Sequence, residues 1–255
     1  MKLKATVLLS SLVLSGTVLA QAKAPEPDYT LSYNIGAVTE YRYRGISQSA
    51  KKPALQGGID FATKGGFYLG TWASTIRWIK DSSNGGINVK GPVEIDIYGG
   101  YKGTINDTFS YDIGGLEYWY AGNNLKNLTG VNANTFELYG ALTAGPATLK
   151  YSHATTNLFG APNSRGSGYL DLSGTFDLGG GFSVVPHIGA QRIANFGTYH
   201  DVSVTLAKDW DGLVASAAIV GTDWKHRFGA DYTLPGSGTK DLAGTTLVLG
   251  IKKNF

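Results

Sequence analysis

Charged side chains recur at alternate positions of short apolar segments, a spacing that gathers them on one face of a β-strand. Such a face can steer ions, because an excess of one sign in a narrow passage attracts counter-ions. Its acidic members are Glu40, Asp60, Glu94, Asp96, Asp112, Glu137, Asp171 and Asp201, and its basic members are Arg42, Arg44, Lys102 and Lys150. All but Arg44 and Asp201 are our candidate pore-lining residues. Since the acids outnumber the bases, we expect a mild preference for cations; alternatively, these charges pair and plug the interior.

One segment has the residue types of a hydrolase. LKYSHATTN (149–157) is similar to the His-x-Ser-Asn pattern of barrel-borne lipases and deacylases, and His153 shares the parity of the apolar Leu149 and Tyr151. Thr155, however, stands where the serine is required, and a serine nucleophile needs a base within hydrogen-bond reach. We expect no enzyme, and a lipid hydrolase stays an alternative.

Composition excludes several other kinds of site. Without cysteine there is no disulfide, no thiolate metal site and no cysteine nucleophile. His187 is expected to face the interior as a polar residue, and His200 and His226 show no ligand spacing, so neither a metal nor a cofactor is expected. The formal net charge of +3 includes Lys2 and Lys4 of the N-terminal segment. The rest of the chain is close to neutral and lacks the excess of basic residues that is typical of nucleic-acid-binding proteins.

The charges lie on segments that alternate with period two, as β-strands do. Glycine and aromatic residues are abundant, with 36 Gly, 15 Tyr, 10 Phe and 5 Trp, which is typical of many strands joined by tight turns. We expect twelve strands, at 30–44, 54–61, 67–78, 92–102, 108–115, 135–142, 147–153, 169–176, 182–190, 199–207, 213–220 and 245–255.

The links between these strands alternate in length. Links such as 79–91, 121–134 and 221–244 are long, whereas 63–66 and 208–212 are short. An up-and-down antiparallel barrel has this rhythm when one rim carries loops and the other carries tight turns. The fold class is therefore all-β, and the strands allow the roughly 9–11 residues that a tilted span of a bilayer needs.

The polar face holds too many charges to pack as a soluble core, which favours a membrane barrel with an apolar exterior over a secreted β-sandwich. Aromatic residues near the strand ends predict a girdle at each rim. Near the long loops they are Tyr41, Tyr43, Trp78, Tyr118, Trp119, Tyr120, Tyr151 and Trp224. Near the short turns they are Phe61, Phe67, Tyr101, Phe109, Phe176, Phe182, Trp210 and Phe255.

The two ends of the chain also indicate an outer-membrane protein. Residues 1–22 have two lysines, an apolar run and an A-x-A ending, which predicts a cleaved signal peptide before a barrel at 23–255. The final strand, TTLVLGIKKNF, ends on Phe255 and resembles the C-terminal signal read by the outer-membrane assembly machinery. Lys253 departs from the usual apolar residue at that position.

Residues 32–74, together with EIDIYGGY (94–101) and SYDIGGLEYWY (110–120), resemble the TorF-type porins, small outer-membrane proteins of Gram-negative bacteria. The resemblance covers about the first half of the mature chain and implies a porin-like channel for passive diffusion of small solutes. Expected partners are outer-membrane lipids and lipopolysaccharide, the barrel assembly machinery, and small solutes or ions, but no nucleic acid. A plugged structural or adhesive barrel is the alternative.

Overall fold

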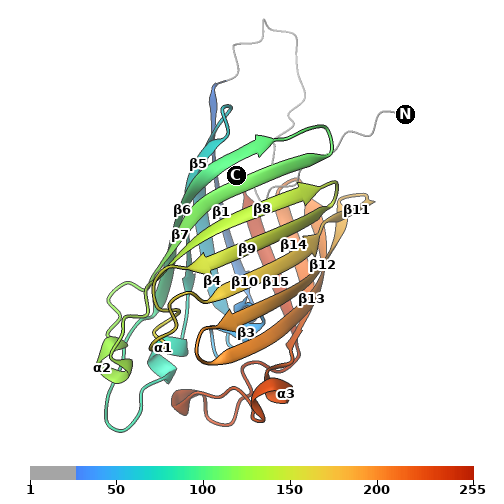
Figure 1. Cartoon of the computed structure of the whole chain (residues 1–255). Coiled ribbons are helices and arrows are strands. Elements are labelled where there is room, and N and C mark those ends of the chain that lie inside the picture. The colour runs from blue at the N-terminus through green and yellow to red at the C-terminus, as the bar shows by residue number, and fades with distance from the viewer. Residues whose placement is uncertain (1–26) are drawn as a thin grey trace, which may run out of the picture.

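The computed structural model describes residues 27–255, which form a closed antiparallel β-barrel (Figure 1). Each strand pairs with its neighbours in the chain, the first pairs with the last, and β10 pairs with β12 to close the ring. The wall consists of β1 (Tyr29–Val38), β4 (Ala54–Thr63), β5 (Phe67–Thr75), β6 (Val93–Thr104), β7 (Phe109–Trp119), β8 (Thr135–Ala144), β9 (Ala147–Ala154), β10 (Gly168–Gly174), β11 (Phe176–Gly179), β12 (Phe182–Ile193), β13 (Gly197–Trp210), β14 (Leu213–Thr222) and β15 (Thr246–Asn254).

β10 and β11 are two parts of one strand that is interrupted at Thr175, so the ring has twelve strands. The prediction of an all-β, up-and-down barrel of about twelve strands is confirmed. The prediction of a signal peptide at residues 1–22 lies outside the described residues.

The barrel wall is apolar outside and polar inside, as the alternation predicts. In β15 the outward Leu247, Leu249 and Ile251 are 58%, 47% and 54% exposed, while the residues between them are half-buried. The same outward parity exposes leucine, isoleucine and valine on the other strands, including Leu31, Ile35, Leu55, Ile59, Leu69, Ile97, Ile113, Leu138, Leu149, Leu170, Ile188, Val204 and Ile219. Among residues 27–255, no helix is long and apolar enough to cross a membrane.

The rim with the tight turns agrees with the prediction. Its turns include Asp211–Gly212, whose φ angles of 53° and 84° suit a two-residue hairpin. Phe255 is half-exposed and stacks on Tyr33, with 5.3 Å between ring centroids. The other outward aromatics at this rim are Phe61, Phe67, Phe109, Phe176, Phe182 and Trp210.

At the opposite rim the first expected strand is too long by six residues, because β1 ends at Val38 instead of Arg44. Residues 39–53 leave the sheet and fold as a small hairpin, β2 (Arg42–Tyr43) and β3 (Ile46–Ser47). Arg44 and Gly45 turn it with φ angles of 47° and 77°. Figure 1 shows β3 within the outline of the barrel.

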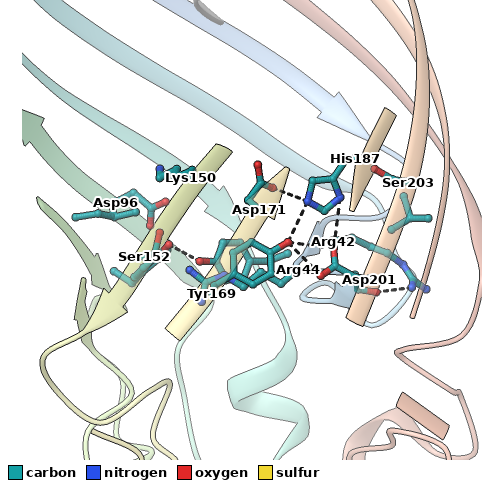
Figure 2. Close-up of a pocket in the computed structure, with 15 residues that line it drawn as sticks. Arg42, Arg44, Asp96, Lys150, Ser152, Tyr169, Asp171, His187, Asp201 and Ser203 are labelled. Carbon is teal, nitrogen blue, oxygen red and sulfur yellow. Dashed lines mark hydrogen bonds and ion pairs between the residues drawn. The ribbon is translucent and has the colours of Figure 1, made fainter. Parts of the chain in front are cut away.

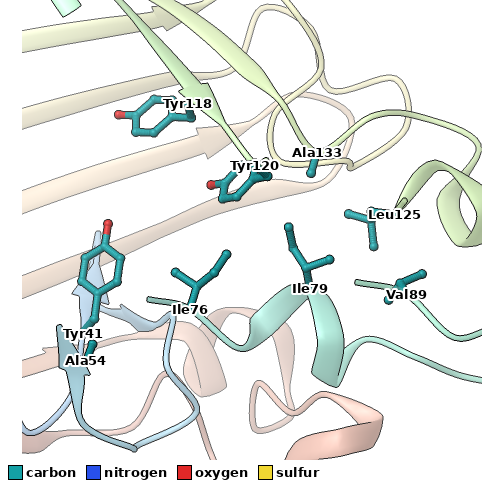
Figure 3. Close-up of a cluster of buried hydrophobic side chains, with 9 residues drawn as sticks. All are labelled: Tyr41, Ala54, Ile76, Ile79, Val89, Tyr118, Tyr120, Leu125 and Ala133. Carbon is teal, nitrogen blue, oxygen red and sulfur yellow. The ribbon is translucent and has the colours of Figure 1, made fainter. Parts of the chain in front are cut away.

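The predicted aromatic girdle at the long-loop rim is largely wrong. Trp119 and Tyr151 point outward, but most of the expected members turn inward. They join a buried cluster, the loop-end cluster (Figure 3), composed of Tyr41, Ala54, Ile76, Ile79, Val89, Tyr118, Tyr120, Leu125 and Ala133. A second cluster gathers Tyr199, Trp224 and Ala243. The links carry α1 (Trp78–Asp81), α2 (Lys126–Thr129), α3 (Trp224–Phe228) and the 3-10 turn η1 (Pro235–Ser237).

Candidate functional site

Residues 39–52, the internal hairpin, cross the barrel interior and form hydrogen bonds with two of the long links and with the barrel wall. The backbone N–H of Ser47 donates to Leu242 O at 2.8 Å, and that of Arg77 donates to Gln48 O at 2.8 Å. On β13, the Tyr199 hydroxyl donates to Arg44 O at 3.0 Å. The hairpin is therefore held at β3, just after β3 and at its tip.

Arg44 lies at the tip of the hairpin and reaches two strands of the wall. Its Nη2 donates to Glu137 Oε2 at 2.6 Å on β8, and its Nη1 donates to Gln191 Oε1 at 2.5 Å on β12. The guanidinium carbon lies 4.7 Å from the Tyr43 ring centroid and 4.3 Å from that of Tyr169. A planar fork of donors can hold a carboxylate, an amide and two rings at once.

Arg42 fixes the base of the hairpin. Its Nε donates to Glu40 Oε1 at 3.0 Å, and its Nη1 donates to the carbonyls of Gly45 (2.7 Å) and Gly244 (2.8 Å). Gly45 lies so close to the wall that a Cβ there would be 2.4 Å from Thr222 Cγ2. The glycine is therefore needed both for its positive φ and for this approach.

Tyr41 connects the hairpin to the wall at β6. Its hydroxyl donates to Glu94 Oε1 at 2.5 Å, and both residues are almost fully buried. Burial first, and then the negative charge of Glu94, raise the pKa of the Tyr41 phenol well above its ordinary value. The phenol therefore remains a donor to the carboxyl group.

The hairpin separates two cavities. The larger, of about 480 Å³, has a polar lining of Arg42, Tyr43, Arg44, Gly45, Asp96, Leu116, Tyr118, Lys150, Ser152, Tyr169, Asp171, His187, Asp201, Ser203 and Val220 (Figure 2). The smaller, of about 160 Å³, is lined mainly by loop and hairpin residues such as Ile46, Trp78, Phe159 and Trp224. Tyr43 and Arg44 line both, so they stand between the two spaces.

A histidine organises one end of the larger cavity. His187 Nε2 lies 2.5 Å from Asp171 Oδ2, and its Nδ1 lies 3.6 Å from Asp201 Oδ1. The Tyr169 hydroxyl donates to Asp201 Oδ2 at 3.1 Å and lies 3.0 Å from His187 Nε2. Figure 2 shows His187 between the two carboxylates, with Asp96 and Lys150 on the other side of the view. Asp171 and Asp201 thus have partners within the wall.

The candidate pore-lining residues fall into three groups, and their role stays a prediction. Arg42, Asp96, Lys150 and Asp171 line the larger cavity. Glu40, Glu94 and Glu137 are buried in pairs with Arg42, Tyr41 and Arg44. On the inner wall beyond the cavity, Asp60 accepts from Tyr98, Asp112 accepts from Tyr68, and Lys102 lies 3.7 Å from Asp112.

Sequence reasoning missed several inward-facing polar side chains. Tyr169 and Gln191 are inward, and their parity with Asp171 and His187 could have found them, but a count of charges omits neutral residues. The half-buried Lys252 and Asp209 share the inward parity of their strands and were also omitted.

His153 lies on the outside of β9, as its parity predicts. Its Nδ1 is 3.4 Å from the Tyr151 hydroxyl, and Thr155 Oγ1 donates to the carbonyl of Phe136. Within residues 27–255, His153 forms no hydrogen bond with a serine, and no group of three or more His, Asp and Glu side chains is arranged to hold a metal ion.

Comparison with solved structures gives the same fold. The chain is similar to a KdgM porin in complex with disordered oligogalacturonate, with a TM-score of 0.54 and 10% identity over 88% of this chain and 98% of that one. It is also similar to the NanC porin, with a TM-score of 0.53 and 11% identity over 88% and 99%. At these identities the likeness concerns the fold alone. A search of curated proteins gave no match.

A family model, described as a bacterial protein of unknown function (Gcw_chp), matches residues 21–255. The chain therefore belongs to the Gcw_chp family.

Proposed function

We propose that this protein is a porin-like channel of the bacterial outer membrane through which small hydrophilic solutes diffuse passively. The observation that carries the proposal is the polar cavity of about 480 Å³ inside a barrel whose exterior is apolar. Barrels of eight strands fill with side chains and those of sixteen leave a channel, so twelve strands allow a narrow path. The resemblance to TorF-type porins supports the same function.

We further propose a mild preference for cations. Carboxylates outnumber basic side chains on the inner face, and Arg42 and Arg44 are each paired with a glutamate. A net negative lining attracts counter-ions into a narrow pore. Changing Asp60 and Asp96 to Asn should shift the reversal potential in a salt gradient toward the nonselective value.

Conductance of the refolded protein in a planar bilayer tests the channel. Discrete current steps that are absent from lipid alone are expected. The second candidate function, a plugged structural or adhesive barrel, is favoured by the loop-end cluster, which buries nine side chains across that rim. Its signature is a folded, heat-modifiable barrel that gives no current.

Export and assembly complete the proposal. A cleaved signal peptide at residues 1–22 would direct export, with outer-membrane lipids, lipopolysaccharide and the assembly machinery as partners. Support for the assembly signal comes from Phe255, half-exposed beside Tyr33 where β1 and β15 close the barrel. Phe255→Ala should slow outer-membrane assembly in cells, and unchanged barrel levels would contradict this role.

A further inference from the structure

Two charges in the larger cavity lack the partners that the other charges there have. Arg42, Arg44, Asp171, His187 and Asp201 all have ion pairs or hydrogen bonds with protein groups. In the part of the chain that the structure describes, neither Asp96 nor Lys150 has a hydrogen bond or an ion pair.

The ammonium group of Lys150, on β9, contacts an aromatic ring but has no negatively charged partner. Its Nζ lies 4.0 Å from the centroid of the Tyr139 ring. A ring face attracts an ammonium group but carries no countercharge. The three N–H donors of Lys150 therefore remain without a protein acceptor.

Asp96, on β6, has the opposite charge and the same lack of a partner. Its register neighbours are Trp72 on β5 and Tyr118 on β7, neither of which is cationic. Its Oδ1 is enclosed without a hydrogen-bond partner. Because an unpaired carboxylate in a partly dry cavity is costly, a cationic donor from outside the chain would stabilise it.

The two groups are too far apart to satisfy each other. β7 and β8 lie between β6 and β9, and Lys150 is in register with Lys102 of β6, six residues from Asp96, so the two backbones are separated both across and along the strands. Both side chains line the cavity, and Figure 2 shows them on the same side of the view. A single small ion could partner one of them and would leave the other unpaired.

We propose that this cavity binds a small zwitterion, with its ammonium group at Asp96 and its carboxylate at Lys150. The proposal deepens the proposed channel function, on which it rests, by naming a solute class. The cavity volume of about 480 Å³ is in the range of small-ligand sites, roughly 300–1,000 Å³. A single molecule pairs both groups only if it carries both charges.

The test is calorimetric titration of the full barrel in detergent with three matched probes. Glycylglycine carries both charges, glycylglycinamide carries only the ammonium group, and N-acetylglycylglycine carries only the carboxylate. Because each hydrogen-bonded charge pair strengthens binding, glycylglycine should bind at least about tenfold more tightly than either half probe.

Variants then assign the ends of the ligand. Asp96→Asn should weaken the binding of glycylglycine about tenfold and leave the binding of N-acetylglycylglycine unchanged. Lys150→Gln should also weaken the binding of glycylglycine about tenfold, but leave the binding of glycylglycinamide unchanged. Asp231→Asn and Lys225→Gln are matched controls, because they remove the same charges from an exposed ion pair outside the cavity lining. They should leave all three affinities unchanged.

Equal affinities of the three probes for the unmodified barrel would overturn the proposal, whether or not the variants fold. Loss of binding in the control pair, but not in the cavity pair, would overturn it as well. Calorimetry in detergent requires no current, so a barrel that binds glycylglycine but does not conduct would refute the channel and keep the site.

Discussion

The two rims of this barrel place the same kind of residue in opposite ways. At the short-turn rim, phenylalanines and a tryptophan point outward, and Phe67 and Trp210 are 65% and 54% exposed. At the long-loop rim, Tyr118 and Tyr120 point inward and are 3% and 2% exposed. Aromatic residues at a strand end therefore do not by themselves indicate a membrane girdle.

The difference follows from the links. A two-residue turn such as Asp211–Gly212 returns the chain at once, so the strand alternation continues to the last residue. A long link supplies apolar side chains such as Ile79 and Leu125, against which an aromatic ring can be buried. The long-loop rim thus has a small core of its own, whereas residues 27–255 form none at the short-turn rim.

The largest expected effect comes from removing the internal hairpin. Replacing residues 40–52, all of the hairpin except Thr39, by Asn-Gly, a favoured two-residue turn, gives the long-loop rim a link of the short-turn kind. Because Tyr43 and Arg44 separate the two cavities, single-channel conductance should rise several-fold. Planar-bilayer recording measures it, and heat-modifiable migration verifies the barrel.

A milder variant isolates the tip of the hairpin. Arg44→Ser removes the contacts with Glu137 and Gln191, whereas Arg77→Ser removes an ion pair with Asp81 that lies outside both cavities. Only the first should raise conductance. If neither Arg44→Ser nor the shortened link does so, the hairpin does not control the path.

Aromatic truncation at the two rims should differ in its energetic cost. Tyr120→Ala removes a buried ring and should lower the free energy of unfolding by about 3–5 kcal/mol, as large-to-small changes in a core do. Phe67→Ala removes a ring that packs on Tyr101 but is largely exposed, so its cost should be clearly smaller. Urea titration in detergent compares them, and equal costs would contradict a core at the long-loop rim.

The same contrast explains how far the sequence could predict the structure. Alternation with period two predicts the twelve strands and their inward charges, because every wall position obeys one parity. That parity stops at Val38, and nothing local marks the inward turn of residues 39–53 except Arg44-Gly45, which also suits an ordinary loop. The partners of the hairpin, Glu137 and Gln191, are 93 and 147 residues away from Arg44. Such distant pairing cannot be predicted from local pattern.

Ion pairs at the two rims give the next test. Arg44 and Glu137 are 6% and 2% exposed, whereas Lys64 and Asp28 at the short-turn rim are 56% and 95% exposed. Glu137→Gln leaves a buried guanidinium without its carboxylate and should cost about 3 kcal/mol or more. Asp28→Asn should cost under about 1 kcal/mol, because water screens the exposed pair. Urea unfolding of both variants measures this, and a similar cost for the two would remove the distinction.

The smallest expected effect is the destabilisation of α3, at the long-loop rim, by low pH. Asp223, just before α3, accepts from the His200 backbone at 2.6 Å and from Arg227 Nε at 2.8 Å, and lies 2.8 Å from His200 Nδ1. Partial burial acts to raise the pKa of Asp223, but these hydrogen bonds outweigh it and lower the pKa to about 2. Since the unfolded value is about 3.9, the carboxylate stabilises the fold fully above about pH 4 and loses this effect as the pH falls toward 2.

Amide hydrogen exchange of residues 223–229 should therefore accelerate as the pH falls from about 4 toward 2. The rates are compared at each pH with those of the Asp223→Asn variant, in which this acceleration should be absent. Asp177 provides the short-turn control, because its carboxylate accepts from the Gly179 backbone in a tight turn without a cationic partner among the described residues. Asp177→Asn should leave exchange in α3 unchanged. If exchange in α3 has the same pH dependence in the unmodified chain and in Asp223→Asn, another group anchors the helix.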